Sequence, residues 1–191
     1  MKQDIILAGV GGQGILTIAN IIDYAAQISG LSFKQAEVHG MSQRGGAVHS
    51  HVRLSDEAIF SDLIPKRAAD LMLSMEPLEA LRYIDYLSEG GQIVASQNPY
   101  VNIPDYPDLD KVLDAIKQSG NHVIVDSEKL SREAGSSRSQ NTVMLGAASG
   151  FMVLEEKILL QSIREFFKSK GERIIDMNIE AFRLGREAAG I

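Results

Sequence analysis

Residues 4–18 read Asp4-Ile-Ile-Leu-Ala-Gly-Val-Gly-Gly-Gln-Gly-Ile-Leu-Thr-Ile18, and this stretch decides the fold. Its apolar run, residues 5–8, has the length and composition of a buried parallel strand. From Ile15 onward, apolar residues recur at the spacing of one helix face. Glycines in the spacing G-x-G-x-x-G separate the two patterns. A strand, a glycine turn and a helix in this order form the context that a phosphate-binding glycine motif needs.

The glycine turn predicts a site for a phosphate or pyrophosphate group. Without Cβ atoms the backbone can turn tightly and a ligand can approach it, while the following helix points unpaired N–H groups at the same place. We therefore expect cofactor-binding residues at Gly9, Gly11, Gly12, Gln13 and Gly14. The alternative is a turn whose glycines only let the helix pack closely on the strand.

The composition is that of an ordinary globular chain. Its 191 residues, 45% hydrophobic and 23% charged, suit a single domain spanning residues 1–191. The net charge of -6 argues against a general nucleic-acid or anionic-membrane binder. The chain has no cysteine, which excludes disulfides, zinc–thiolate sites and cysteine-ligated iron–sulfur clusters within it. We expect neither a signal peptide nor a membrane span, so the cytoplasm is the default location.

A second glycine loop follows the next predicted strand. Residues 32–38 and 47–54 both have strand character, and the latter alternates apolar and polar side chains. The connection 39–46 is too short for a parallel crossover, so strand 47–54 should run antiparallel to strand 32–38. We also expect strands 4–8 and 32–38 to be parallel neighbours, and 58–61 to form another hairpin arm.

The two glycine loops should meet at one edge of the sheet, where open α/β sheets bind ligands. The second loop contributes Arg44, Gly45 and Gly46. A guanidinium at this place would clamp a phosphate or carboxylate with two parallel hydrogen bonds, and the alternative is a solvated surface arginine. Glu37 lies roughly where dinucleotide-binding folds place a ribose-binding carboxylate.

The rest of the chain continues an α/β pattern. Further strands are expected at residues 69–75, 92–96 and 122–125. Helices are expected at residues 77–87, stopped by Gly90-Gly91, and at 108–119, 143–151, 154–167 and 179–189. The predicted fold class is α/β: a Rossmann-like three-layer fold with a mixed, mostly parallel sheet and a helical C-terminal third.

The candidate acid–base groups are the histidines His39, His49 and His51. His49 and His51 lie two apart on one strand face, a spacing that can bind a metal. No nearby carboxylate completes such a site in the sequence, so burial or a place in an interface is the favoured interpretation. A serine-hydrolase elbow and a P-loop lysine are both missing. The residues therefore predict a ligand site with no visible catalytic set and no metal.

Several motifs resemble the gamma portion of the 2-oxoacid:ferredoxin oxidoreductases, and the resemblance covers nearly the whole chain in the same order. The motifs are Gly9-Val-Gly-Gly-Gln-Gly14, Glu37-Val-His-Gly-Met-Ser-Gln-Arg-Gly-Gly46, Val52-Arg-Leu-Ser55, Ala69-Asp-Leu-Met-Leu-Ser-Met-Glu-Pro-Leu-Glu-Ala80, Asn141-Thr-Val-Met-Leu-Gly146 and Asn178-Ile-Glu-Ala-Phe182. Within this family, the Ser-Gln-Arg-Gly-Gly form is most similar to the β subunits of the indolepyruvate ferredoxin oxidoreductases.

The resemblance implies a division of labour between subunits. Family members decarboxylate a 2-oxoacid on thiamine diphosphate, pass electrons through 4Fe–4S clusters to ferredoxin and form an acyl-CoA. The thiamine diphosphate and the clusters belong to a large partner subunit, in agreement with the absence of cysteine here. This chain would pack on that catalytic subunit. The phosphates of coenzyme A would suit the first glycine loop and Arg44, although the resemblance itself assigns no cofactor to the chain.

Two other classes of protein stay open at this point: a free-standing NAD(P)- or flavin-dependent oxidoreductase, and a non-catalytic nucleotide-binding protein. The antiparallel hairpin predicted after the second strand speaks against the first of them. A subunit should also expose a docking surface. The candidates are the helix containing Gly146, Ala147 and Gly150 and the sheet face bearing His49 and His51, and we expect the chain alone to form a two-fold dimer.

Overall fold

The computed structural model describes residues 1–40, 45–101 and 103–191. Within them, six strands form one sheet in the order β2-β3-β1-β4-β5-β6. The strands are β1 (Lys2–Val10), β2 (Ser32–His39), β3 (Ala47–Ser55), β4 (Ala69–Ser74), β5 (Leu87–Ser96) and β6 (Asn121–Val125). The helices are α1 (Ile15–Ile28), α2 (Pro77–Arg82), α3 (Leu109–Gln118), α4 (Ser127–Glu133), α5 (Gln140–Ser149), α6 (Glu156–Phe167) and α7 (Glu172–Ala188). Three 3-10 turns cover Ile84–Tyr86, Ser137–Ser139 and Lys168–Lys170.

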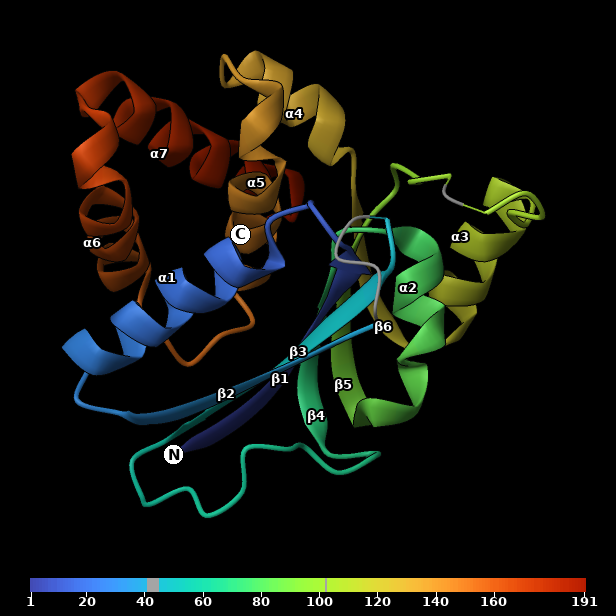
Figure 1. Ribbon diagram of the computed structural model, residues 1–191, viewed down its shortest axis with the longest axis horizontal. Helices are drawn as coiled ribbons and strands as arrows, with labels where there is room; N and C mark the ends of the chain where they lie inside the picture. Colours follow the sequence, from blue (N-terminus) through green and yellow to red (C-terminus); the bar gives the residue numbers. More distant parts are fainter. Residues whose placement is uncertain (41–44, 102) are drawn as a thin grey trace.

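Helices cover both faces of the sheet, with α1 and α5–α7 on one side and α2 and α3 on the other (Figure 1). Strands β1, β4, β5 and β6 are parallel, whereas β3 runs antiparallel to both of its neighbours. The predicted class, an α/β fold with a mixed, mostly parallel sheet and a helical C-terminal third, is confirmed. Among the described helices, none has the length and apolar character that crossing a bilayer requires.

Strand β1 is apolar from Ile5 onward, where both of its faces are buried. Ile5 and Leu7 pack into the cluster formed with α1 and α5–α7, while Ile6 packs into the cluster on the α2 and α3 side. All three side chains are 0% exposed. The uninterrupted apolar run at the start of the chain therefore reports a central strand, as such runs do in parallel sheets.

Strand β3 lies between β1 and β2, so the predicted pairing of the first two strands is wrong. The short hairpin determined the direction of β3, as expected. Helix α1, however, connects β1 to a strand two positions away, and β3 occupies the position between them. Since β1 and β2 still point the same way, Val10 and His39 end at one edge of the sheet, opposite Ala47 and Val48 respectively. The edge expected to bind a ligand is preserved.

The predicted hairpin arm at residues 58–61 is also wrong, since no strand is present there. The guanidinium of Arg53 instead donates to the carbonyl oxygens of Ser61 (3.0 Å) and Leu63 (3.1 Å). The same guanidinium binds the buried carboxylate of Asp4. A side chain from β3 thus satisfies backbone groups that a paired strand would otherwise have satisfied.

Helix α2 is shorter than predicted. Pro77 does open it, but the helix ends at Arg82, and Gly90 and Gly91 lie inside β5 rather than after a helix. Gly90 has a φ of 81°, and a Cβ at Gly91 would lie 3.0 Å from the carbonyl oxygen of Ala69. This glycine pair therefore accommodates an irregular stretch of strand pairing, which the pairing of β4 with β5 also records.

Helices α5 and α7 cross in direct backbone contact. A Cβ at Gly146 would lie 2.0 Å from the carbonyl oxygen of Phe182, and a Cβ at Gly185 would lie 2.0 Å from that of Val143. Both helices begin earlier than predicted, and α5 is buried from Asn141 to Ser149. The expectation that α5 presents a docking surface is wrong, because its small residues receive α7 of the same chain.

Candidate functional site

The first glycine loop joins β1 to α1 and needs glycine at two positions. Gly12 has a φ of 106°, and Gly14, which precedes the first residue of α1, has a φ of 83°. Residues with a Cβ rarely adopt this left-handed region. Gln13 braces the turn from inside: its Oε1 accepts from the N–H of Val10 (2.8 Å), and its Nε2 donates to the carbonyl of Met75 (3.3 Å).

Gly9 is needed because neighbouring side chains pack closely against its backbone. A Cβ there would lie 2.8 Å from Gln13 Oε1 and 3.0 Å from Met75 Cβ. Of the five candidates in the first loop, Gly9 and the Gln13 side chain are thus engaged within the protein. Gly11, Gly12 and Gly14 line open space.

The two predicted glycine loops lie side by side. The N–H of Gly11 donates to the carbonyl of Gly46 (2.9 Å), and the N–H of Gly45 donates to the carbonyl of Gly11 (3.2 Å). The strand order explains the contact, because β3 starts next to the end of β1. Arg44, the predicted phosphate clamp, lies outside the described residues.

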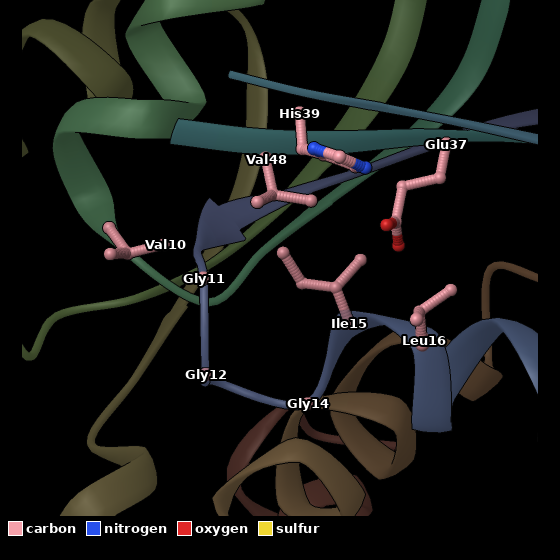
Figure 2. Close-up of a pocket in the computed structure, with 9 residues that line it drawn as sticks. All are labelled: Val10, Gly11, Gly12, Gly14, Ile15, Leu16, Glu37, His39 and Val48. Atoms are coloured by element: carbon pink, nitrogen blue, oxygen red, sulfur yellow. The ribbon is translucent and has the colours of Figure 1, made fainter. Parts of the chain in front are cut away.

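A pocket of about 420 Å³ opens on the β2 side of the glycine loop (Figure 2). Gly11, Gly12 and Gly14 form one wall, and Glu37 and His39 line the pocket from β2. Figure 2 shows the Glu37 carboxylate directed toward the start of α1. We refer to this as the Glu37 pocket. Its carboxylate suits hydroxyl donors better than phosphate oxygens.

A second pocket of about 530 Å³ opens on the other side of the same glycines. Gly12 and Gly14 are shared with the Glu37 pocket, and the other lining residues are Gln13, Tyr100, Ser137, Arg138, Gln140 and Asn141. We refer to this as the Arg138 pocket. Gln13 was among the predicted site residues, whereas the other side chains that line this pocket were not predicted from the sequence.

The two strand histidines, His49 and His51, line neither pocket and are packed against residues that follow α2 and β3. His49 stacks against Tyr83 with ring centroids 4.3 Å apart, and His51 lies edge-on to Tyr86 at 5.3 Å. His51 Nδ1 also accepts from the N–H of Ile64 (3.1 Å). Among the described residues, no cluster of three or more His, Asp or Glu side chains could hold a metal ion.

His49 and His51 are 9% and 2% exposed. The sheet face expected for docking is thus covered by the chain's own tyrosines. With α5 covered as well, the structure counts against the self-association that was argued from these two surfaces.

Burial, with the nearby His51 second, lowers the pKa of His49 from 6.5 to about 4. The unfolded chain therefore binds a proton at a higher pH than the folded chain, so stability present above pH 6.5 should be lost as the pH falls toward 4. We expect His49→Phe to flatten this part of the stability profile, and His49 Nδ1 leaves no hydrogen-bond partner behind. Urea unfolding of both proteins from pH 7 to pH 4 measures the difference, and parallel profiles would contradict the assignment.

The comparisons with known proteins agree with one another. The chain matches the family model Pyruvate ferredoxin/flavodoxin oxidoreductase over residues 4–188. It is 40% identical over 202 residues to indolepyruvate oxidoreductase subunit IorB of Thermococcus kodakarensis, covering 99% of this chain and 97% of that protein. The subunit of the same name from Archaeoglobus fulgidus is 36% identical, with coverage of 99% and 96%.

A solved structure gives the same result. The chain superposes with a TM-score of 0.80 and 25% identity on 2-oxoglutarate:ferredoxin oxidoreductase from Magnetococcus marinus with 2-oxoglutarate, coenzyme A and succinyl-CoA bound. The match covers 99% of this chain and 31% of that chain. The whole of the present fold therefore corresponds to one part of a longer polypeptide there.

Proposed function

Because this chain belongs to the pyruvate ferredoxin/flavodoxin oxidoreductase family, we propose that it is the small subunit of an oxidoreductase that acts on indolepyruvate or a related aryl pyruvate. The observation that carries the proposal is 40% identity to an indolepyruvate oxidoreductase subunit over nearly the full length of both chains. The alternative of a free-standing NAD(P)- or flavin-dependent enzyme finds no support, since β3 interrupts the parallel pairing that a dinucleotide-binding half requires.

The chemistry of the complex has to be shared with a larger subunit. The chain has no cysteine and so offers no thiolate for a 4Fe–4S cluster. Two pockets flank the first glycine loop, and their described lining residues include no nucleophile–base pair. We therefore assign thiamine diphosphate and the clusters to the partner subunit, which would transfer electrons onward to ferredoxin. We assign the catalytic residues of the reaction to the same subunit.

We propose that the ligand edge of this chain helps to bind coenzyme A. The Magnetococcus marinus oxidoreductase that shares this fold has coenzyme A bound. Here, a glycine loop with open space on both sides precedes a 14-residue helix that has no acidic residue in its first turn. Such a helix start attracts anions, because its first N–H groups have no partners within the helix. The proposed contacts are Gly11, Gly12, Gly14, Arg44, Gly45 and Gly46.

Co-purification from the native organism tests the assembly. We expect an affinity-tagged chain to bring down a large subunit in a brown complex that contains iron and thiamine diphosphate. Recovery of a colourless protein that binds NADH and has no large partner would overturn the proposal.

Gly12→Ala should weaken coenzyme A binding by roughly tenfold, or about 1.4 kcal/mol. No heavy atom of the described residues lies within 4 Å of a Cβ built at Gly12, so the methyl group would enter space left for a ligand. Gly30→Ala is the matched control, because Gly30 has a φ of 71°, similar open space, and a position at the far end of α1. Both variants should lose roughly 1–2 kcal/mol of stability from backbone strain.

Isothermal titration of coenzyme A into the assembled complex distinguishes the two variants. Equal affinities of the Gly12 and Gly30 variants for coenzyme A would mean that Gly12 is needed only for the backbone conformation of the loop.

A further inference from the structure

One buried carboxylate at the ligand edge lines neither pocket. Glu76 follows β4, whose end lies beside the end of β1, and it is 1% exposed. Among the residues that the structure describes, no cationic side chain forms an ion pair with it. A carboxylate in such a place has lost its hydration and depends on hydrogen bonds for its stabilisation.

The hydrogen bonds of Glu76 fall into two groups. Its Oε2 accepts from the N–H of Glu79 (2.9 Å), so Glu76 caps the start of α2. Its Oε1 accepts from the N–H of Tyr100 (3.3 Å) and from the hydroxyl of Tyr106. Capping α2 requires only the first of these bonds. The other two attach the connection between β5 and α3 to the end of β4.

We refer to the described residues of this connection, 97–101 and 103–108, as the Tyr100 segment. Figure 1 shows the segment at the same end of the sheet as the first glycine loop. It contains no helix or strand. Asn98 fastens its beginning, since Oδ1 accepts from the N–H of Glu128 (2.9 Å) and Nδ2 donates to Asp126 (3.0 Å). Glu76 fastens the stretch that follows.

Tyr100 connects this attachment to the ligand edge. It is one of the residues that line the Arg138 pocket, and it is 45% exposed. Its backbone N–H is the group that Glu76 binds, so the position of the Tyr100 backbone depends directly on the carboxylate. Burial, followed by the hydrogen bond to Glu76, raises the pKa of Tyr106 above its usual 10, so the phenol remains a donor near neutral pH.

We propose that Glu76 is a positioning residue for coenzyme A: by holding Tyr100, it fixes one wall of the Arg138 pocket before the ligand arrives. This inference rests on the proposed function, which brings coenzyme A to this edge of the sheet. Glu76 touches no ligand itself and acts through Tyr100. A wall that is already held in place lowers the cost of ordering the site on binding.

Glu76→Ser tests the attachment. Serine is among the preferred capping residues, so α2 keeps its cap, but the short hydroxyl cannot reach the Tyr100 segment. In the complex with the large subunit, the KM for coenzyme A should rise by roughly threefold to tenfold, with kcat and the KM for indolepyruvate within about twofold of wild type. Glu79→Ser is the matched control: Glu79 is 3% exposed, and its carboxylate accepts from Arg82 within α2. It should leave all three constants within about twofold of wild type.

Tyr106→Phe covers the case in which Glu76→Ser does not fold. The substitution removes one hydroxyl from a half-buried ring, and it should raise the KM for coenzyme A by roughly twofold to fivefold at an unchanged kcat. Hydrogen–deuterium exchange of the full chain follows the attachment without any ligand. The amide of Tyr100 should exchange faster in the Glu76 and Tyr106 variants and at the wild-type rate in the Glu79 variant.

A wild-type KM for coenzyme A in the folded Glu76 and Tyr106 variants would overturn the inference, even where the Tyr100 amide exchanges faster. Equal effects of Glu76→Ser and Glu79→Ser would also overturn it, because the residue would then act only through the stability of α2. A wild-type complex that shows no turnover dependent on coenzyme A would instead reject the proposed function. Normal turnover of the wild-type complex, matched by the variants, would reject this inference alone.

Discussion

Gly146→Ala is expected to destabilise the protein by roughly 3 kcal/mol or more, at the upper end of what overpacking costs. The added methyl carbon would lie 2.0 Å from the carbonyl oxygen of Phe182, a contact with backbone that no rotamer change can relieve. Helix α7 would have to move away from α5, and much of the core between them would open, including the fully buried ring of Phe182.

Chemical denaturation measures this loss as a lower urea midpoint at an unchanged m value. Gly40→Ala is the control, because a Cβ there meets no described heavy atom within 4 Å and Gly40 does not have a positive φ. If Gly146→Ala and Gly40→Ala unfold at the same urea concentration, the close crossing of α5 and α7 is not what holds the C-terminal third in place.

Arg53→Ala should cost about 3–5 kcal/mol, the usual result of removing one partner from a buried ion pair. Asp4 is 0% exposed, and it accepts from Arg53 Nε (2.7 Å) and Nη2 (3.1 Å). Without the guanidinium, the one cationic partner left to this carboxylate among the described residues would be the solvent-exposed ammonium of Lys2, 3.0 Å away. The carbonyl groups of Ser61 and Leu63 would lose the hydrogen bonds from Arg53 at the same time.

Arg132→Ala provides the comparison for this loss. Arg132 pairs with Glu128 one helical turn away, and both side chains are substantially exposed. Such pairs contribute about 0.3–0.5 kcal/mol. Thermal unfolding should therefore separate the two variants clearly, and a similar small decrease for both would show that the Asp4–Arg53 pair is energetically equivalent to a surface pair.

The sequence predicted the local structure of each segment better than it predicted which strands pair and which helices pack together. The apolar run, glycine turn and helical pattern of residues 4–28 each depend on neighbours in the chain, and all three are present. Strand order depends on which strand occupies the position next to β1. The pattern of residues 32–55 gives the direction of β3 but not its second neighbour, since β3 pairs antiparallel with strands on both sides.

The small residues of α5 show the same limit. The sequence correctly indicated that Gly146 permits a close approach of another backbone. It did not reveal that the approaching backbone is α7, because Gly185 lies 39 residues further along the chain and has no local signature. A close-packing motif alone does not distinguish contact within a chain from contact between chains.

The sequence predicted the glycine loops of the candidate site but not the side chains that line its second pocket. Both glycine loops follow strands, so their meeting at one edge could be inferred from strand direction. Arg138 and Asn141 lie at the start of α5, more than a hundred residues after the first glycine loop. They reach the same edge because α5 packs against the sheet. The one available signal was the polar run 136–141 before an apolar helix, which also fits an ordinary capping loop.

The central claim is that this chain is an obligatory but incomplete part of a 2-oxoacid:ferredoxin oxidoreductase. Reconstitution tests it most directly: viologen reduction driven by indolepyruvate and coenzyme A is measured anaerobically with this chain alone, with the large subunit alone, and with both. We predict no activity for this chain alone, little for the large subunit alone, and full activity on mixing. Activity of this chain without a partner, or an undiminished rate of the large subunit in its absence, would contradict the account.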